Sequence, residues 1–111
     1  MEIAKIIFEQ IKAFAPTPVL WSWGASKWQA VKENQIEGVG EQYLGGLLFY
    51  VRGHHHKGHV LVTLAGNDTY TVSLGYVRKG KINVKKQFKD IHFDMLARTI
   101  DDNIERIPEY A

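Results

Sequence analysis

Four of the five histidines lie in one short segment, residues 51–60, which reads VRGHHHKGHV. Neutral imidazole is a common ligand of zinc, copper and nickel, so His54, His56 and His59 could converge on one metal ion within a turn. The established zinc motifs add further ligands at fixed spacings, whereas this run contains no carboxylate and the whole chain has no cysteine. The glycines that flank the run favour a solvated connection between two strands. We therefore predict no metal and no cofactor, and keep the three histidines as the alternative.

A second group of reactive side chains is basic. Arg78, Lys79, Lys81, Lys85 and Lys86 lie between residues 78 and 86 with no acidic residue among them. Such a group can neutralise phosphates, and neighbouring aromatic side chains can stack on bases. The opposing interpretation is that lysines protect an exposed edge strand from pairing with other chains. We predict that this hairpin is a surface for nucleic acid or for a protein partner.

The three tryptophans are candidates for packing and for ligand binding. Trp21 and Trp23 alternate, so they would point the same way from a strand, and core packing is their expected role. A pocket lined by Trp21, Trp23 and Trp28 is the alternative.

Catalytic motifs are missing from the sequence. It contains no G-x-S-x-G elbow, no phosphate-binding glycine loop and no H-E-x-x-H. The aspartates at 68, 94, 101 and 102 are accounted for by a turn and by an amphipathic helix. The sequence therefore favours a non-enzymatic protein.

Composition indicates one folded domain over residues 1–111. Hydrophobic residues make up 45% of the chain and charged residues 23%, which is typical of soluble globular proteins. No apolar run approaches the roughly 18 residues of a membrane span, and the N-terminus lacks the pattern of a signal peptide. Together with the absence of cysteine, these features lead us to expect a cytoplasmic protein without membrane contact.

Hydrophobic periodicity predicts the elements that must position these side chains. Ile3, Ile7, Ile11 and Phe14 share one face of a helix that ends before Pro16. Period-two alternation predicts strands further along the chain, joined by connections short enough to require antiparallel pairing. The expected helices are 2–15 and 92–107, and the expected strands are 20–23, 47–51, 59–65, 69–77 and 82–88.

Residues 33–46 contain four glycines and little periodicity, so we expect a loop there, and the most mobile part of the chain. The fold class that follows is α+β: a two-layer sandwich with an antiparallel meander of four to five strands, flanked by an N-terminal and a C-terminal helix.

Three segments resemble small uncharacterised proteins of bacteriophages, plasmids and other mobile elements. Those proteins share a TGAKNF-type segment, an ITLN-x-x-D-x-Y pair of strands and a DML near the start of the last helix. The matching residues here are Gly24, Ala25, Lys27 and Trp28, then Val60, Val62, Thr63, Leu64, Asp68, Tyr70 and Val72, and finally Asp94, Met95 and Leu96. The resemblance implies a mobile-element origin and no known activity.

The function that we expect is that of an accessory protein of a mobile element or its bacterial host, which binds nucleic acid or a protein partner through the basic hairpin. Two alternatives stay open. One is a metal-binding protein or metal-dependent enzyme that uses His54, His56 and His59, and the other is a homo-oligomeric structural protein, for example a homodimer.

Overall fold

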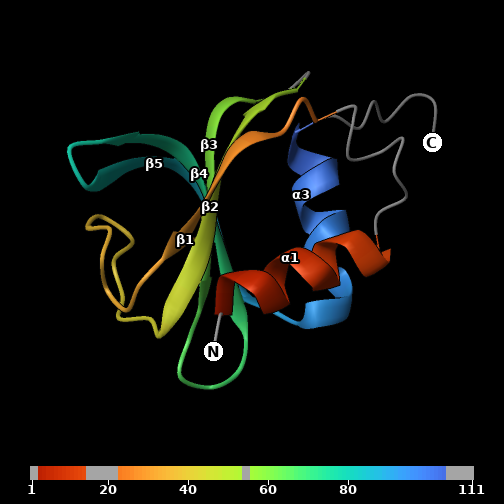
Figure 1. Ribbon diagram of the computed structural model, residues 1–111, viewed down its shortest axis with the longest axis horizontal. Helices are drawn as coiled ribbons and strands as arrows, with labels where there is room; N and C mark the ends of the chain where they lie inside the picture. The colour runs from red at the N-terminus through yellow and green to blue at the C-terminus, as the bar shows by residue number, and fades with distance from the viewer. Residues whose placement is uncertain (1–2, 15–22, 54–55, 105–111) are drawn as a thin grey trace.

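A single antiparallel sheet with two helices on one face forms the described structure (Figure 1). The structure is a computed structural model, and it describes residues 3–14, 23–53 and 56–104. The strands follow one another in the sheet in chain order, from β1 at one edge to β5 at the other. The elements are α1 (Ile3–Phe14), β1 (Ser26–Val31), β2 (Gly45–Arg52), β3 (Lys57–Leu64), β4 (Tyr70–Arg78), β5 (Lys81–Ile91), the 3₁₀ turn η1 (Phe93–Met95) and α3 (Leu96–Ile104). The predicted α+β fold with a five-stranded meander is confirmed.

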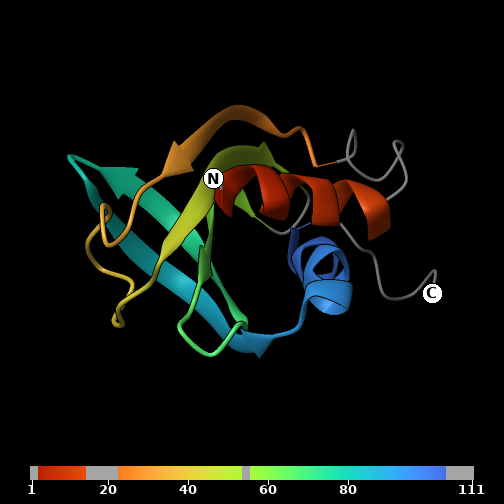
Figure 2. The same ribbon diagram turned by 60° about the horizontal axis from the view of Figure 1, so that its bottom comes forward.

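The main core lies between the sheet and the two helices, which cover the same face (Figure 2). The alternation that predicted the strands is the reason, because every second residue of β2, β3 and β4 points to this face. Ile7 and Ile11 of α1 and Ile100 of α3 pack against them and are fully buried. The strand residues of this core are Leu47, Phe49, Val51, Val60, Val62, Tyr70, Val72 and Leu74.

The position of the first strand differs from the prediction. Residues 20–22 lie outside the described part of the chain, and Trp23 lies in a turn, fully buried, where its Nε1 donates to Asp101 Oδ1 over 2.9 Å. The first strand of the described residues is Ser26–Val31, in which only Val31 is buried. An edge strand that is exposed on nearly its whole length shows no apolar alternation, so periodicity could not predict it.

The C-terminal α-helix begins four residues later than predicted, at Leu96, after a 3₁₀ turn. This turn follows His92, and α3 continues to Ile104. The last predicted positions, 105–107, lie outside the described residues. Neither helix in the described segments has the length and apolar character that crossing a membrane would require.

The opposite face of the sheet has its own apolar cluster, covered by residues 32–44 (Figure 1). This segment is a loop, as predicted, but it is packed onto the sheet and is not a free excursion. Its Ile36, Val39 and Tyr43 are buried against sheet residues, of which Leu48 and Leu61 are two. The Tyr43 hydroxyl accepts from the Ile36 N–H (2.7 Å) and donates to the Ile36 carbonyl (2.9 Å), so the loop is closed on itself.

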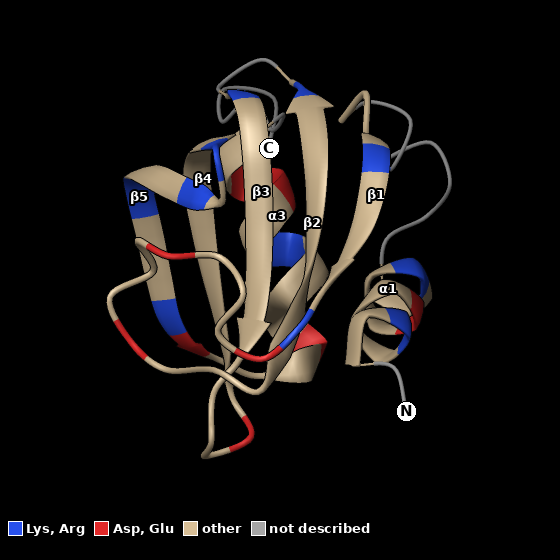
Figure 3. Cartoon of the chain, turned by 60° about the vertical axis from the view of Figure 1, so that its left-hand side comes forward, with Lys and Arg blue, Asp and Glu red and all other residues tan. Residues whose placement is uncertain are grey.

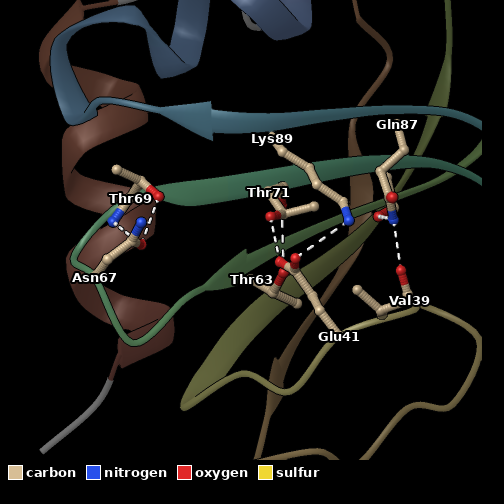
Figure 4. A network of polar contacts seen from close by, with 9 residues as sticks. Val39, Glu41, Thr63, Asn67, Thr69, Thr71, Gln87 and Lys89 are labelled. Carbon is tan, nitrogen blue, oxygen red and sulfur yellow. Dashed lines mark hydrogen bonds and ion pairs between the residues drawn. The ribbon is translucent and has the colours of Figure 1, made fainter.

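Polar contacts tie the loop to the sheet (Figure 4). Glu41 accepts a 2.6 Å hydrogen bond from Thr71 Oγ1 and pairs with Lys89 Nζ at 3.4 Å. The Gln87 side-chain amide donates to the carbonyl of Val39 over 2.8 Å. These contacts fix the loop over the half of the sheet that carries the threonines of β3 and β4.

The loop also reaches the hairpin between β4 and β5. Glu37 forms an isolated bridge with Lys81, in which the Glu37 N–H donates to Gly80 O (2.9 Å) and Ile82 N–H donates to Glu37 O (2.8 Å). Gly38 makes this approach feasible, because a Cβ there would lie 2.3 Å from the Ile82 carbonyl oxygen. The hairpin is therefore held along one edge by the loop.

The hairpin itself turns through two residues. Arg78 pairs with Lys81, and the intervening Lys79 and Gly80 have φ of 53° and 78°. Positive φ at both positions defines the tight turn that matches the twist of paired strands and prefers Asn-Gly. Lysine at the first position is therefore strained, because its Cβ disfavours left-handed backbone.

We predict that Lys79→Asn raises the free energy of unfolding by about 0.5–1 kcal/mol, because asparagine tolerates this backbone better than lysine. Gly80→Ala should lower it by about 1 kcal/mol, because a side chain is introduced at positive φ. Urea unfolding followed by circular dichroism measures both changes. Equal stability of the two variants would show that the turn is not the constraint described here.

Candidate functional site

The predicted basic residues lie on the hairpin and on β5, at the edge of the sheet. Arg78, Lys79, Lys81, Lys85 and Lys86 are all exposed. Lys81, Lys85 and Lys86 lie on the edge strand β5, a position at which lysines also discourage pairing with other chains. What the sequence did not indicate is that this cluster continues across the sheet.

Three further cations from other strands join the same end of the sheet. Arg52 of β2 is the register partner of Lys57 of β3. Lys27 of β1 follows Ser26, whose partner on β2 is Tyr50, and Tyr50 precedes Arg52 by two residues. All three are exposed. Figure 3 shows lysine and arginine on several strands at this end, and acidic residues on the loops and on both helices. We call this set of cations the basic end, and it consists of Lys27, Arg52, Lys57, Arg78, Lys79, Lys81, Lys85 and Lys86.

The cations of the basic end are not neutralised by the described part of the protein. None of them forms an ion pair with a described carboxylate. By contrast, Lys89 pairs with Glu41, and Arg98 pairs with Asp102 at 3.7 Å. Like charges that lie close together repel one another and therefore lower the stability of the folded protein. They also attract an anionic partner, so binding explains their clustering better than folding stability does.

A row of aromatic rings crosses the sheet within the basic end. Tyr50 and His59 are partners in the β2–β3 register and lie on the face opposite the helices, because their neighbours Phe49 and Val60 belong to the main core. The ring centroids of Tyr50 and His59 are 5.3 Å apart, and those of His59 and Tyr76 are 6.1 Å apart, both edge to face. Residues 32–44 cover Leu48 and Leu61 but not this row.

Lysine side chains lie over the two outer rings. Lys27 Nζ is 5.4 Å from the Tyr50 ring centroid, and Lys85 Nζ is 5.7 Å from that of Tyr76. Lys85 is the extra residue of a β-bulge, because Leu74 pairs with Lys86 and the next residue, Gly75, pairs with Val84. A bulge redirects a side chain from its regular alternation, and here it aims Lys85 at the tyrosine.

Tyr76 borders an open hollow. It is 45% exposed, and with Arg78, Lys81, Ile82 and Asn83 it lines a depression of about 570 Å³. The proximity of Tyr50 raises the pKa of the Tyr76 hydroxyl. The depression therefore combines an aromatic ring, two cations and one side-chain amide.

A smaller hollow lies on the other side of Lys85. It measures about 140 Å³ and is lined by His56, Lys57, Leu74, Lys85, Lys86 and Asn103. Ammonium groups and an amide around a space of this size can bind a phosphate or another small oxyanion through charge-assisted hydrogen bonds. The sequence could not reveal this hollow, because its residues come from the β2–β3 connection, β3, β4, β5 and α3.

The two described histidines of the VRGHHHKGHV segment hold backbone groups. His56 is 9% exposed, and its Nε2 lies 3.1 Å from the carbonyl oxygen of His59, to which it donates. His59 Nδ1 accepts from the Val77 N–H over 3.1 Å. The segment forms the β2–β3 connection, as predicted, and Gly53 N–H donates to His56 O across it.

The electrostatic environment keeps both imidazoles neutral. Burial lowers the pKa of His56, and Lys85 and Lys86 lower it further against the opposing effect of its bond to His59. Burial likewise lowers the pKa of His59, with Lys27 and His56 contributing. Neutral rings suit the hydrogen bonds that they make here.

The structure describes two of the three histidines of the metal hypothesis. His54 lies outside the described residues, and within the described ones no three histidine, aspartate or glutamate side chains gather as a metal site would require. His56 and His59 each use one ring nitrogen for a backbone group, which leaves one nitrogen on each ring.

The two described tryptophans lie in different surroundings. Trp21 lies outside the described residues, Trp23 is buried in the core, and Trp28 is 38% exposed. Trp28 stacks on Phe49 with centroids 4.3 Å apart and borders a hollow of about 340 Å³ between α1 and β1. Core packing, the role expected from the sequence, fits Trp23.

Comparisons of the chain with protein families, with curated proteins and with solved structures found no match. The interpretation of the site therefore rests on its own geometry.

We predict that the protein loses stability as the pH falls below about 6.5, the ordinary pKa of histidine. The pKa of His56 is lower in the folded protein than in the unfolded chain, so the unfolded chain takes up a proton at a higher pH. Protonation of His56 in the unfolded chain then favours unfolding. Urea unfolding at about pH 7.5 and about pH 5.5 measures the loss. In His56→Gln, which keeps a side-chain donor but does not titrate, the loss should be smaller.

His92→Gln serves as the control, because His92 is exposed and precedes η1, at the far end of β5 from the hairpin. It should lose as much stability between the two pH values as the parent protein. An unchanged loss in His56→Gln would contradict the assignment.

Proposed function

We propose that the protein is a non-enzymatic accessory protein that binds nucleic acid through the basic end. One observation carries the proposal: exposed cations without described acidic partners lie around the half-buried rings of Tyr50 and His59 and the exposed ring of Tyr76. Cations supply contacts to the phosphate backbone, and aromatic rings supply contacts to bases. This combination matches the chemistry of a nucleic acid more fully than that of an acidic protein, which offers no bases.

Edge protection explains only part of this arrangement. Lysines on β5 would suffice to discourage pairing at that edge. Arg52 and Lys57, however, lie on β2 and β3 inside the sheet, where no edge needs protection. The same holds for His59, which lies on the inner strand β3 and contributes its ring to the aromatic row without protecting any edge. A binding surface accounts for both groups.

The hollow lined by His56, Lys85 and Lys86 supports the proposal further. It has room for a single phosphate group, and it adjoins Lys85, which also contacts the Tyr76 ring. One lysine thus links a phosphate-sized space to an aromatic ring, as one nucleotide links a phosphate to a base.

The proposal places the protein in the cytoplasm and in a mobile element or its bacterial host. The absence of cysteine supports the first, because reducing compartments do not use disulfides. The resemblance in residues 24–28, 60–72 and 94–96 supports the second.

We predict that a fluorescein-labelled single-stranded oligonucleotide binds the protein with a strong salt dependence, measured by fluorescence anisotropy. The slope of log Kd against log salt should be about 0.7 for each phosphate contact. The triple variant Lys79→Glu, Lys81→Glu and Lys85→Glu should weaken binding by at least roughly tenfold at low salt and reduce the slope by about 2, because three contacts are removed.

The matched control reverses Lys5, Lys12 and Lys32, which are exposed but lie on α1 and after β1. This control changes the net charge by the same amount as the triple variant of the basic end, and it should leave most of the affinity for the oligonucleotide intact. Equal weakening in both variants would mean that net charge alone drives binding. Undetectable binding to any oligonucleotide at low salt would refute the proposed function.

A further inference from the structure

We infer that the hollow beside Tyr76 is a base-binding site for single-stranded nucleic acid. The inference rests on the proposed function and specifies its ligand: an unpaired base stacks on the Tyr76 ring, and the flanking phosphates lie near Arg78 and Lys81. The carrying observation is that these three residues line one open depression together with the Asn83 amide.

The Tyr76 ring is held in place and is still accessible. On one side the His59 ring meets it edge to face, and His59 is fixed by the hydrogen bond from Val77 N–H. Lys85, which lies over the ring, is not among the residues that line the 570 Å³ hollow. A ring with a fixed orientation loses little conformational freedom on stacking, which favours its use as a platform.

The other residues of the hollow complete the chemistry of a nucleotide. The Asn83 side chain offers both a donor and an acceptor, so it can hydrogen-bond the edge of a base. Arg78 and Lys81 pair with each other across the hairpin, so their charges stand at one end of the hollow. Tyr50 and His59 continue the aromatic row, which provides a path for the neighbouring base.

Duplex DNA fits this site poorly for two reasons. In a duplex the faces of the bases are covered by stacking and cannot reach a tyrosine ring. A two-stranded ribbon could instead enter the major groove, which is about 12 Å wide. The bridge between Glu37 and Lys81 adds a third segment of backbone to one edge of this hairpin, so it is not a free ribbon.

The test compares four labelled probes of equal length: single-stranded DNA, the same sequence as RNA, the DNA strand with abasic sites, and the duplex. The parent protein should bind both single strands roughly tenfold more tightly than the abasic strand, because base stacking is lost in the latter. The duplex should bind no more tightly than the abasic strand. The DNA and RNA arms show which backbone is preferred, and a preference for either supports the inference.

Variants locate the contact. Tyr76→Leu should lose roughly tenfold in affinity for the single strand and less than about twofold for the abasic strand, whereas Tyr76→Phe should retain the parent affinity. Phe93→Leu is the matched control, because Phe93 is 52% exposed but packs on Phe14 at the helices, and it should change nothing. The abasic probe tests the same contact on the unaltered protein, so the result does not depend on the folding of a variant.

Failure of the inference differs from failure of the proposed function. Equal affinity for intact and abasic strands, with binding still lost in the triple lysine variant, would overturn the base site and leave nucleic-acid binding by charge. Tighter binding of the duplex would overturn it as well. Absence of binding to every probe would overturn both.

Discussion

The sheet is apolar on both faces, but the helices cover only one of them, and this constraint shapes the rest of the molecule. Leu48, Leu61 and Ile82 point away from the helices and must be shielded from water by something else. Residues 32–44 supply that cover. Burying such side chains is worth about 1.5–3 kcal/mol each, which is enough to order a loop that has little regular structure.

The loop covers only part of that face, and Tyr50 and His59 of the candidate site lie on the uncovered part. Glu41 and Gln87 hold the loop over the threonine and serine side chains of β3 and β4, and the Glu37 bridge holds it along the hairpin. Beyond the loop, the same strands carry Tyr50 and His59. The packing of residues 32–44 thus covers one part of this face and leaves the rings of Tyr50 and His59 uncovered, beside the cations of the basic end.

The sequence predicted what depends on local periodicity. The four strands β2 to β5, both helices and the hairpin that carries Arg78 to Lys86 follow from spacing alone, and each is present. Contacts between distant segments were beyond such reasoning. Lys27, Arg52 and Lys57 look unrelated in the sequence, and only the register of three strands brings them to the basic end. The loop was expected to be mobile because the sequence shows its glycines. The sequence does not show which sheet residues bury Ile36, Val39 and Tyr43 of this loop.

The lysines that lie over tyrosine rings suggest how binding can be favourable without a large change in the protein. A cation over an exposed ring is stabilised by about 0.5–1 kcal/mol. A base that stacks on the ring contributes about 1–3 kcal/mol. In the proposed complex, Lys85 moves from the Tyr76 ring to a phosphate, where counterion release adds to its binding. The exchange replaces one weak contact with two stronger ones, and the bulge at Lys85 keeps its ammonium group close to both positions.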